Sequence, residues 1–254
     1  MCTLTFAPTN EGFLVGMNRD EQRTRPAALP PEIFNGDNAQ AIYPREAGGG
    51  TWIACSSRGN LFALLNWYSA ETDTLGPKIK TRGDLIPKLV YELDSRSTAN
   101  RLVGIDFAGM HPFRVVGAFR GEKVLCEWRW DGKHLDCLRF AWGLMHWFSS
   151  SLSDSSAAQF RGRTCAAATS DETISMQEWL QRLHKSHDPG PGPYSICMHR
   201  PDAATVSYTQ VECTPRGIFM DYLGGPPCET ASSAMQLPFR RVPRLLEPSA
   251  FRPR

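Results

Sequence analysis

Cys2 is the residue of this sequence with the clearest capacity for chemistry. If Met1 is removed, a thiol and a free α-amine share one Cα, and an α-amine with a pKa of about 7.7–8.0 is partly neutral near pH 7. The amine can then accept the proton of the thiol, so that one residue supplies a nucleophile and its general base. The alternative is a cysteine near a frayed chain end.

A charged cluster follows at the point where the chain should return to Cys2. Residues 2–8 alternate as in a strand, residues 9–12 form a polar turn, and residues 13–17 are apolar, a pattern that predicts a hairpin. The far end of a tight hairpin lies beside its near end, so we expect these cluster residues to lie close to Cys2: Asn18, Arg19, Asp20 and Glu21. Arg19 would lower the pKa of the thiol through its charge, and Asp20 would bond the ammonium group or orient the substrate. A solvated charged loop is the alternative.

Asn66 ends a second predicted hairpin, which has strands over 51–56 and 61–67. Its second strand is almost wholly apolar, and a buried amide left without a hydrogen bond costs roughly 1–3 kcal/mol. Asn66 is therefore either a strand cap or a donor aimed at a ligand group such as a developing oxyanion. The glycines at 48–50 precede this hairpin and suit a tight turn or a close approach to a ligand.

Composition excludes several classes of function. The net charge of +2 over 254 residues gives no reason to expect a nucleic-acid partner. The eight cysteines contain no C-x-x-C pair, and Cys197-Met198-His199 is the only close pairing of Cys with His, so we expect no metal site and no cofactor. We find no signal peptide and no apolar run of 18 residues. We therefore expect a cytoplasmic protein with reduced thiols, no membrane span and a small-molecule ligand, and the oligomeric state stays open.

The order of the predicted elements indicates the fold class. The first two hairpins are followed by helices, strands, helices and strands again, with helices over 85–93, 97–103, 157–168 and 175–185, and strands over 113–119, 123–130, 134–140, 143–149, 194–200, 205–211 and 217–222. Arg25-Pro26 and Pro30-Pro31 predict a loop. We expect an α+β fold, a four-layer αββα sandwich of two antiparallel sheets, with a single-sheet α+β domain as the alternative.

We predict one domain over 1–225. Residues 226–254 are rich in Pro and Arg and are expected to form an extended or disordered tail, or a basic binding arm.

Five short motifs, in this order, carry a resemblance to a known family: Met1-Cys2, Asn18-Arg19-Asp20-Glu21, Gly49-Gly50-Thr51-Trp52, Ser57-Arg58-Gly59 and Leu65-Asn66. The sequence resembles the NRDE family, also called the Transport and Golgi organisation protein 2 family. That family is similar in predicted fold to the N-terminal-nucleophile hydrolases, notably the choloylglycine hydrolase and penicillin V acylase group. The resemblance therefore implies the same αββα architecture.

The resemblance also implies roles for individual residues. Cys2 becomes nucleophile and general base, Arg19 and Asp20 the charged pair beside it, and Asn66 an oxyanion donor. Asn18, Glu21 and a late arginine, Arg200, would bind substrate. Arg19 and Asp20 are adjacent here, whereas the hydrolase group separates the pair by two residues, so either Asp20 or Glu21 is the site carboxylate. A second Asn donor has no clear counterpart, and the serines at 149–151 stand near its expected place.

Two function classes follow from this reading. One is a hydrolase in which Cys2 cleaves an amide or related acyl bond of a small molecule. The other is a binding or trafficking protein that uses the same cleft for haem or an acyl lipid such as acyl-CoA. A plain interaction domain is a third reading, which the charged cluster facing Cys2 disfavours.

Overall fold

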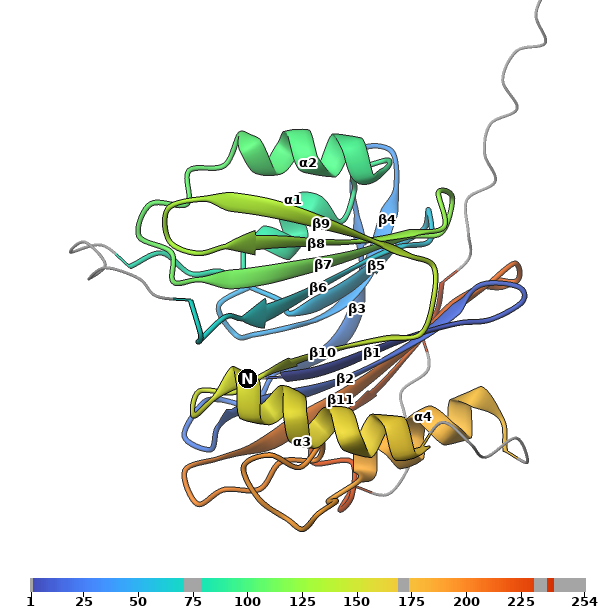
Figure 1. The fold of residues 1–254 in the computed structure, drawn as a ribbon. Coiled ribbons are helices and arrows are strands. Elements are labelled where there is room, and N and C mark those ends of the chain that lie inside the picture. Colours follow the sequence, from blue (N-terminus) through green and yellow to red (C-terminus); the bar gives the residue numbers. More distant parts are fainter. Residues whose placement is uncertain (1, 71–78, 169–173, 231–236, 240–254) are drawn as a thin grey trace, which may run out of the picture.

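A computed structural model of the chain describes residues 2–70, 79–168, 174–230 and 237–239. Two antiparallel sheets pack face to face, and a pair of helices covers the outer face of each sheet (Figure 1). The predicted αββα sandwich is confirmed, and the single-sheet alternative is excluded. In this four-layer arrangement, each sheet buries one face against the other sheet and the other face against helices.

The six-stranded sheet contains the start of the chain as the second strand from one edge. Its order is β10-β1-β2-β11-β12-β13. The bounds are Met145–Ser149 for β10, Cys2–Pro8 for β1, Phe13–Gln22 for β2, Ala203–Thr214 for β11, Gly217–Leu223 for β12 and Leu237–Phe239 for β13.

The seven-stranded sheet follows sequence order from β3 to β9. Its strands are Leu29–Asn35 (β3), Gln40–Arg45 (β4), Ile53–Ser56 (β5), Asn60–Asn66 (β6), Phe113–Phe119 (β7), Val124–Trp130 (β8) and Leu135–Ala141 (β9). Neighbouring strands are joined by short connections except for β6 and β7, between which the chain forms two helices.

Helices α1 (Leu85–Leu89) and α2 (Ser95–Val103) cover the seven-stranded sheet, while α3 (Asp154–Ala167) and α4 (Met176–Lys185) cover the six-stranded one (Figure 1). Side-chain caps begin three of them: Asp94 and Ser97 form a capping box, and Ser153 and Ser175 each accept from a backbone N–H of the first turn. Among the described residues, each helix is too short or too polar to cross a bilayer.

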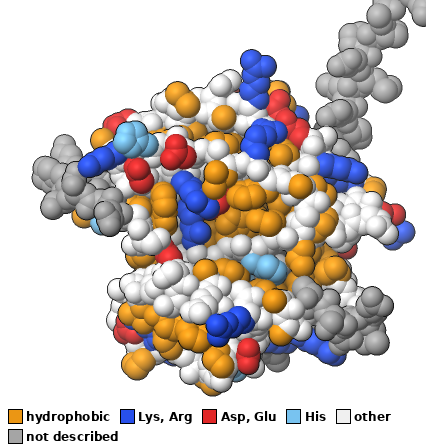
Figure 2. Space-filling view, viewed as in Figure 1, with side chains coloured by type: hydrophobic (Ala, Val, Ile, Leu, Met, Phe, Trp, Pro, Cys, Tyr) orange, Lys and Arg blue, Asp and Glu red, His pale blue; other side chains and the backbone are white. Residues whose placement is uncertain are grey.

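Strand alternation divides the core into layers. In β1, Cys2, Leu4 and Phe6 point between the two sheets, where they join the central hydrophobic cluster. The residues between them point at α3 and α4. A few hydrophobic side chains reach the surface, and Leu138 of β9 is 38% exposed. Figure 2 shows hydrophobic side chains gathered on the face of the molecule that is turned to the viewer in Figure 1.

A chain of hydrogen bonds runs beneath β1 and β2 on the helix side. Asn18 Nδ2 donates to two backbone carbonyls, so Asn18 Oδ1 must accept from His184 Nδ1 at 3.1 Å. His184 Nε2 then accepts from Thr5 Oγ1 at 3.1 Å, and Thr5 Oγ1 accepts from His146 Nδ1 at 3.0 Å. The His184 ring lies on Gly16, where a Cβ would come within 2.8 Å of it. Both imidazoles are therefore built in as neutral rings.

Four sequence predictions need correction. Pro30-Pro31 does not form a loop but lies inside β3. β3 is an edge strand, where the missing N–H of a proline costs little. Residues 194–200 form a loop with one isolated bridge, His199 to Ala204, because the preceding prolines and glycines interrupt strand pairing. β2 extends to Gln22, so the charged cluster is part of the strand. The helix predicted over 85–93 ends at Leu89.

The expected boundary between domain and tail at residue 225 stays a prediction. Beyond it the structure describes a turn over 226–230 and β13, which pairs with β12.

Candidate active site

Cys2 is held in place by three elements. Antiparallel pairing sets Ser149 of β10 on one side of it and Arg19 of β2 on the other. The Cys2 N–H donates to Ser149 Oγ at 2.9 Å, and the Cys2 carbonyl accepts from Arg161 Nη1 of α3 at 3.3 Å. Only 6% of the residue is exposed. The thiol therefore projects from a fixed backbone at the edge of the space between the sheets.

Arg19 lies directly opposite Cys2 on the same face of the sheet, so the predicted proximity is confirmed. Its guanidinium donates to Glu46 Oε1 at 2.6 Å, lies 3.5 Å from Glu21 Oε2, and stacks over the Trp52 ring, 4.5 Å from its centroid. Two carboxylates thus balance much of the positive charge that Arg19 brings to the thiol.

The pKa of the Cys2 thiol is raised overall, although the charge of Arg19 lowers it as expected. Burial has the largest effect, because it disfavours the thiolate. The positive amino terminus opposes burial, the negative charge of Asp20 adds to it, and the Asp20 N–H and the Arg19 charge lower the pKa only weakly. Activation of this thiol therefore depends on a base beside it more than on a nearby guanidinium.

The Asp20 carboxylate lies on the opposite face of β2, toward α3. Its Oδ1 accepts from Thr205 Oγ1 at 2.7 Å and its Oδ2 from Arg161 Nη2 at 3.2 Å, and the carboxylate and guanidinium are both fully buried. Asp20 acts on the thiol pKa in two ways: its charge raises it, and its backbone N–H lowers it. Its side chain is placed to position Cys2 through Arg161, which also donates to Thr3 Oγ1 at 2.7 Å.

Strand alternation also sorts the two other members of the cluster. Asn18 is fully buried on the helix side, bonded to the backbone of residues 184 and 196, so the structure does not bring its side chain to the cavity beside Cys2. Glu21 lies on the cavity side, where Arg25 Nη1 donates to it at 2.8 Å. Burial opposes ionisation of Glu21, but the Gln22 N–H and the neighbouring positive charges outweigh it and lower its pKa. Glu21 is therefore the carboxylate that faces the cavity.

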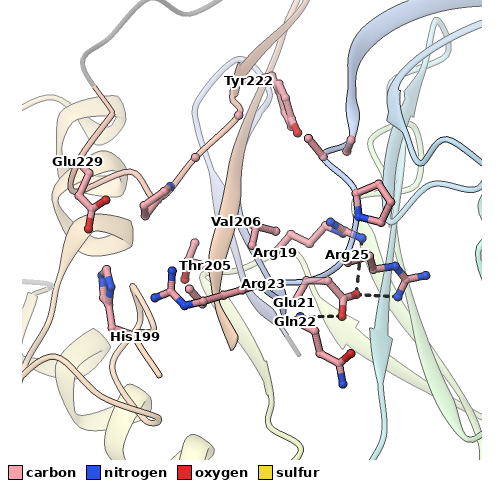
Figure 3. Close-up of a pocket in the computed structure, with 17 residues that line it drawn as sticks. Arg19, Glu21, Gln22, Arg23, Arg25, His199, Thr205, Val206, Tyr222 and Glu229 are labelled. Carbon is pink, nitrogen blue, oxygen red and sulfur yellow. Dashed lines mark hydrogen bonds and ion pairs between the residues drawn. The ribbon is translucent and has the colours of Figure 1, made fainter. Parts of the chain in front are cut away.

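A cavity of about 380 Å³ opens beside the thiol between the two sheets. Its lining includes Cys2, Arg19, Glu21, Trp52, Asn66 and Arg82. A neighbouring cavity of about 310 Å³ shares Arg19, Glu21 and Arg25 with it and extends to Tyr222 and His199 (Figure 3). The three shared residues form a charged partition between the two spaces.

Asn66 ends β6 on the opposite wall of the Cys2 cavity, and its Nδ2 donates to the Tyr68 hydroxyl at 2.6 Å. The Asp154 carboxylate ties this strand end to the other sheet. Its Oδ2 accepts from the N–H groups of Tyr68 and Ser69 at 2.8 and 2.9 Å, and its Oδ1 accepts from the Ser150 N–H at 2.7 Å. Asp154 therefore sets the separation between Asn66 and the strand that flanks Cys2.

Arg200 does not line the Cys2 cavity among the residues that the structure describes. Its guanidinium makes two bonds to the Asp202 carboxylate, at 3.0 and 2.6 Å, and one to Ser151 Oγ at 3.2 Å. Arg200 therefore forms an ion pair at the base of the loop before β11, and the structure does not bring it to the cavity beside Cys2.

Residues that sequence reasoning missed complete the site. Arg161 gave a weak signal, because it falls on the buried side of a helix with Ala157 and Cys165 at helical spacing. Glu46 lies two residues before the glycines at 48–50. The serine run at 149–151 was noted, and its first member bonds the Cys2 nitrogen. Nothing in the sequence pattern pairs Asp154 with residues 68 and 69.

A second group of reactive side chains lies beyond the smaller cavity. His187, Cys197, His199 and Cys228 each offer a ligand atom, and these atoms all lie within 4.8 Å of one another. The expectation of no metal site did not take this cluster into account. It rested on short ligand spacings, whereas the fold brings these residues together from three separate segments.

Comparisons with known sequences give the following matches. Residues 1–155 match the family described as Transport and Golgi organisation 2. The Transport and Golgi organization 2 homolog of Mus musculus is 34% identical over 90 residues, and the human homolog is 33% identical over 88. Each alignment spans about a third of this chain (34%) and of the curated relative (31%).

Solved structures with a similar fold include two hydrolytic enzymes. A mutant of conjugated bile acid hydrolase from Clostridium perfringens aligns with a TM-score of 0.53 at 9% identity, covering 94% of this chain and 92% of that one. Penicillin V acylase from Agrobacterium tumefaciens aligns with a TM-score of 0.50 at 9% identity, covering 95% and 99%. This likeness extends over nearly the whole chain.

Proposed function

This chain belongs to the Transport and Golgi organisation 2 family, and we propose that it is an N-terminal-nucleophile hydrolase whose nucleophile is Cys2. The reaction proposed is cleavage of an amide or related acyl bond in a small molecule. The observation that carries the proposal is the bond from the Cys2 backbone N–H to Ser149 Oγ, which would hold the α-amine freed by removal of Met1 at the wall of a cavity.

In this mechanism, removal of Met1 leaves the Cys2 α-amine free to take the proton of the thiol. Because burial raises the pKa of the thiol, a base within the same residue is the most effective source of thiolate. The thiolate sulfur bonds to the substrate carbonyl carbon, and the ammonium returns its proton to the leaving nitrogen. Water, deprotonated by the same amine, then hydrolyses the thioester and releases the acid.

The developing oxyanion needs hydrogen-bond donors at the cavity wall. Asn66 Nδ2 is such a donor, and a backbone N–H would be the second donor. The present acceptor of Asn66 is the Tyr68 hydroxyl, which a substrate oxygen can replace. The Asp20 N–H stabilises the thiolate before attack. The Asp20 carboxylate acts indirectly, by keeping Arg161 on the Cys2 carbonyl.

The lining of the cavity favours an acyl compound that carries an anionic group. Arg82, Lys80 and Arg25 contribute positive charge, while Trp52 and Leu64 contribute apolar surface. The names of the two fold relatives make conjugated bile acids and penicillin V suitable first members of a screen, alongside N-acyl amino acids of graded chain length.

The test is covalent capture followed by turnover. The intact mass of purified protein should lack Met1, and incubation with an activated acyl donor should add one acyl group on Cys2. Cys2→Ser should abolish turnover of any substrate found in the screen while leaving its binding intact. Cys137→Ser, at an exposed cysteine of β9, is the matched control and should behave as wild type.

Either of two results would reject the mechanism: an active preparation that retains Met1, or wild-type turnover by Cys2→Ser. A carrier of haem or acyl-CoA is the second candidate, favoured by the cationic lining of the cavity, which suits carboxylates and phosphates. For a carrier, Cys2→Ser leaves binding unchanged, no acyl adduct forms, and Arg82→Ala weakens binding.

A further inference from the structure

The loop before β11 and the turn after β12 bring together two imidazoles and two thiols. His187 follows α4, Cys197 and His199 lie in the loop 194–200, and Cys228 lies in the turn 226–230. Cys197 is fully buried, and the other three are partly buried. All eight cysteines of the chain are free thiols, so no disulfide explains the approach of Cys197 to Cys228.

Four of the six distances between the ligand atoms are close to the edges of a tetrahedron around a small ion, and the other two, from His187 to the sulfurs, are within 4.8 Å. With zinc–sulfur bonds of about 2.3 Å and zinc–nitrogen bonds of about 2.0–2.1 Å, the edges should be about 3.8 Å (S–S), about 3.6 Å (S–N) and about 3.3 Å (N–N). The two sulfurs lie 3.4 Å apart, His199 Nε2 lies 3.6 and 3.4 Å from them, and the two Nε2 atoms lie 3.1 Å apart. Each observed edge is slightly short of, or equal to, its ideal value.

Hydrogen bonding cannot account for this convergence. His199 Nε2 has three neighbours at contact distance, Cys197 Sγ, Cys228 Sγ and His187 Nε2. A ring nitrogen has either one proton or one lone pair, so it can satisfy only one partner well. A cation at the centre of the group would engage all four atoms at once.

We propose that His187, Cys197, His199 and Cys228 bind one zinc ion. A Cys₂His₂ set is a characteristic zinc ligand set, and two thiolates neutralise the charge of the ion, which suits a partly buried position. Because the protein supplies all four ligands, the site is closed and structural.

The ion would join the loop before β11 to the chain after β12. His199 and Glu229 both border the smaller cavity, and Figure 3 shows them on the same side of it, facing the charged partition of Arg19, Glu21 and Arg25. Zinc would therefore fix that wall of the cavity without taking part in chemistry at Cys2.

Metal content of the full chain tests the proposal. Protein expressed with added zinc and purified without chelators should contain one equivalent of zinc per chain by elemental analysis and by native mass spectrometry. Exchange with cobalt should give the visible bands of a tetrahedral site and the near-ultraviolet band of thiolate-to-cobalt charge transfer. A chelator should lower the melting temperature of the wild-type protein.

Cys228→Ser and His199→Ala should lose the zinc, whereas Cys137→Ser and His134→Ala, at exposed residues of β9 and of the turn before it, should keep it. Circular dichroism identifies any variant that fails to fold, and the wild-type cobalt spectrum stands independently of the variants. The proposal is overturned if zinc-supplemented wild type holds no metal, if the metal persists in both ligand variants, or if peptide mapping of freshly purified protein finds Cys197 and Cys228 joined as a disulfide.

Discussion

On the outer face of the β1–β2 hairpin, polar side chains are fully buried beneath α3 and α4, and their partners are protein groups: Asn18 with His184, and Asp20 with Arg161. On the inner face, Cys2, Arg19 and Glu21 border a cavity. Successive residues of one strand therefore alternate between satisfying the fold and facing a ligand. The comparison predicts that outer-face changes reduce stability, whereas inner-face changes reduce chemistry in a protein that stays folded.

Acid should expose the largest difference. Burial lowers the pKa of His184 to about 3 and that of His146 to about 4, whereas the unfolded value is about 6.5. Between these values the unfolded chain binds protons that the folded chain excludes, so stability is complete above pH 6.5 and falls as the pH falls. His184 alone should contribute a slope of about 1.4 kcal/mol per pH unit.

Urea unfolding at several pH values between 4 and 7 measures this slope. His184→Gln should be less stable than wild type at pH 7 but should lose less stability on acidification. The exposed His134 is the control, since His134→Gln should leave the pH profile unchanged. An equal slope in His184→Gln and wild type would contradict the neutral, buried imidazole.

The buried ion pair should give the next largest effect. Arg161→Met leaves the Asp20 carboxylate without its buried partner and should cost about 3–5 kcal/mol of unfolding free energy. Adding Asp20→Asn should recover part of this loss. Arg163→Met, at an exposed position of the same helix, should change stability little. A mild effect of Arg161→Met would mean that the outer face does not depend on this pair.

Asn66 tests the inner face. If Asn66 is an oxyanion donor, Asn66→Ala should lower kcat by about 10²–10³, equivalent to about 2.7–4 kcal/mol, with a smaller change in substrate affinity. Its unfolding free energy should change little, because Asn66 is only partly buried. Tyr68→Phe removes only the present acceptor of Asn66, so kcat should stay near the wild-type value. Equal losses in the two variants would assign the effect to the loop and not to the amide.

Arg19 should give the smallest effect. Arg19→Gln removes a charge that lowers the pKa of Cys2, so alkylation of Cys2 at neutral pH should slow, by less than about tenfold because Glu46 and Glu21 already balance that charge. Arg25→Gln, which contacts the same two carboxylates from a more exposed position, is the control. The measurement is the alkylation rate of Cys2 in each of the two variants, followed by peptide mass spectrometry.

The sequence allowed the fold and half of the site to be predicted because both depend on local patterns. Alternation and turn residues gave most strands, and the hairpin alone predicted that Arg19 lies opposite Cys2. If the predicted strand had been continued beyond residue 17, the same alternation would have placed the side chains of Asn18 and Asp20 on the helix side. The burial of Asn18 on the helix side was not predicted, because its run of four polar residues was placed after the strand and not within it.

The remainder depends on contacts that no local pattern contains. Arg161 meets Asp20 across 141 residues, and Cys228 meets Cys197 across 31, through loops whose course is set by the rest of the fold. Cys197-Met198-His199 was visible as a pair of ligand types, but its two partners lie in other segments. Such sites require the three-dimensional arrangement before the chemistry of their residues can be read.

The Asp154 carboxylate has a consequence for the motions of the molecule. It is the common acceptor for the amide protons of residues 68, 69 and 150. Residues 68 and 69 follow β6 of one sheet, and residue 150 follows β10 of the other. Those three protons can exchange with solvent only when the carboxylate lets go, so they should exchange in one shared opening event, at a rate set by the parting of the two sheets. Hydrogen exchange at three amides would thus report directly on how often the cavity beside Cys2 widens.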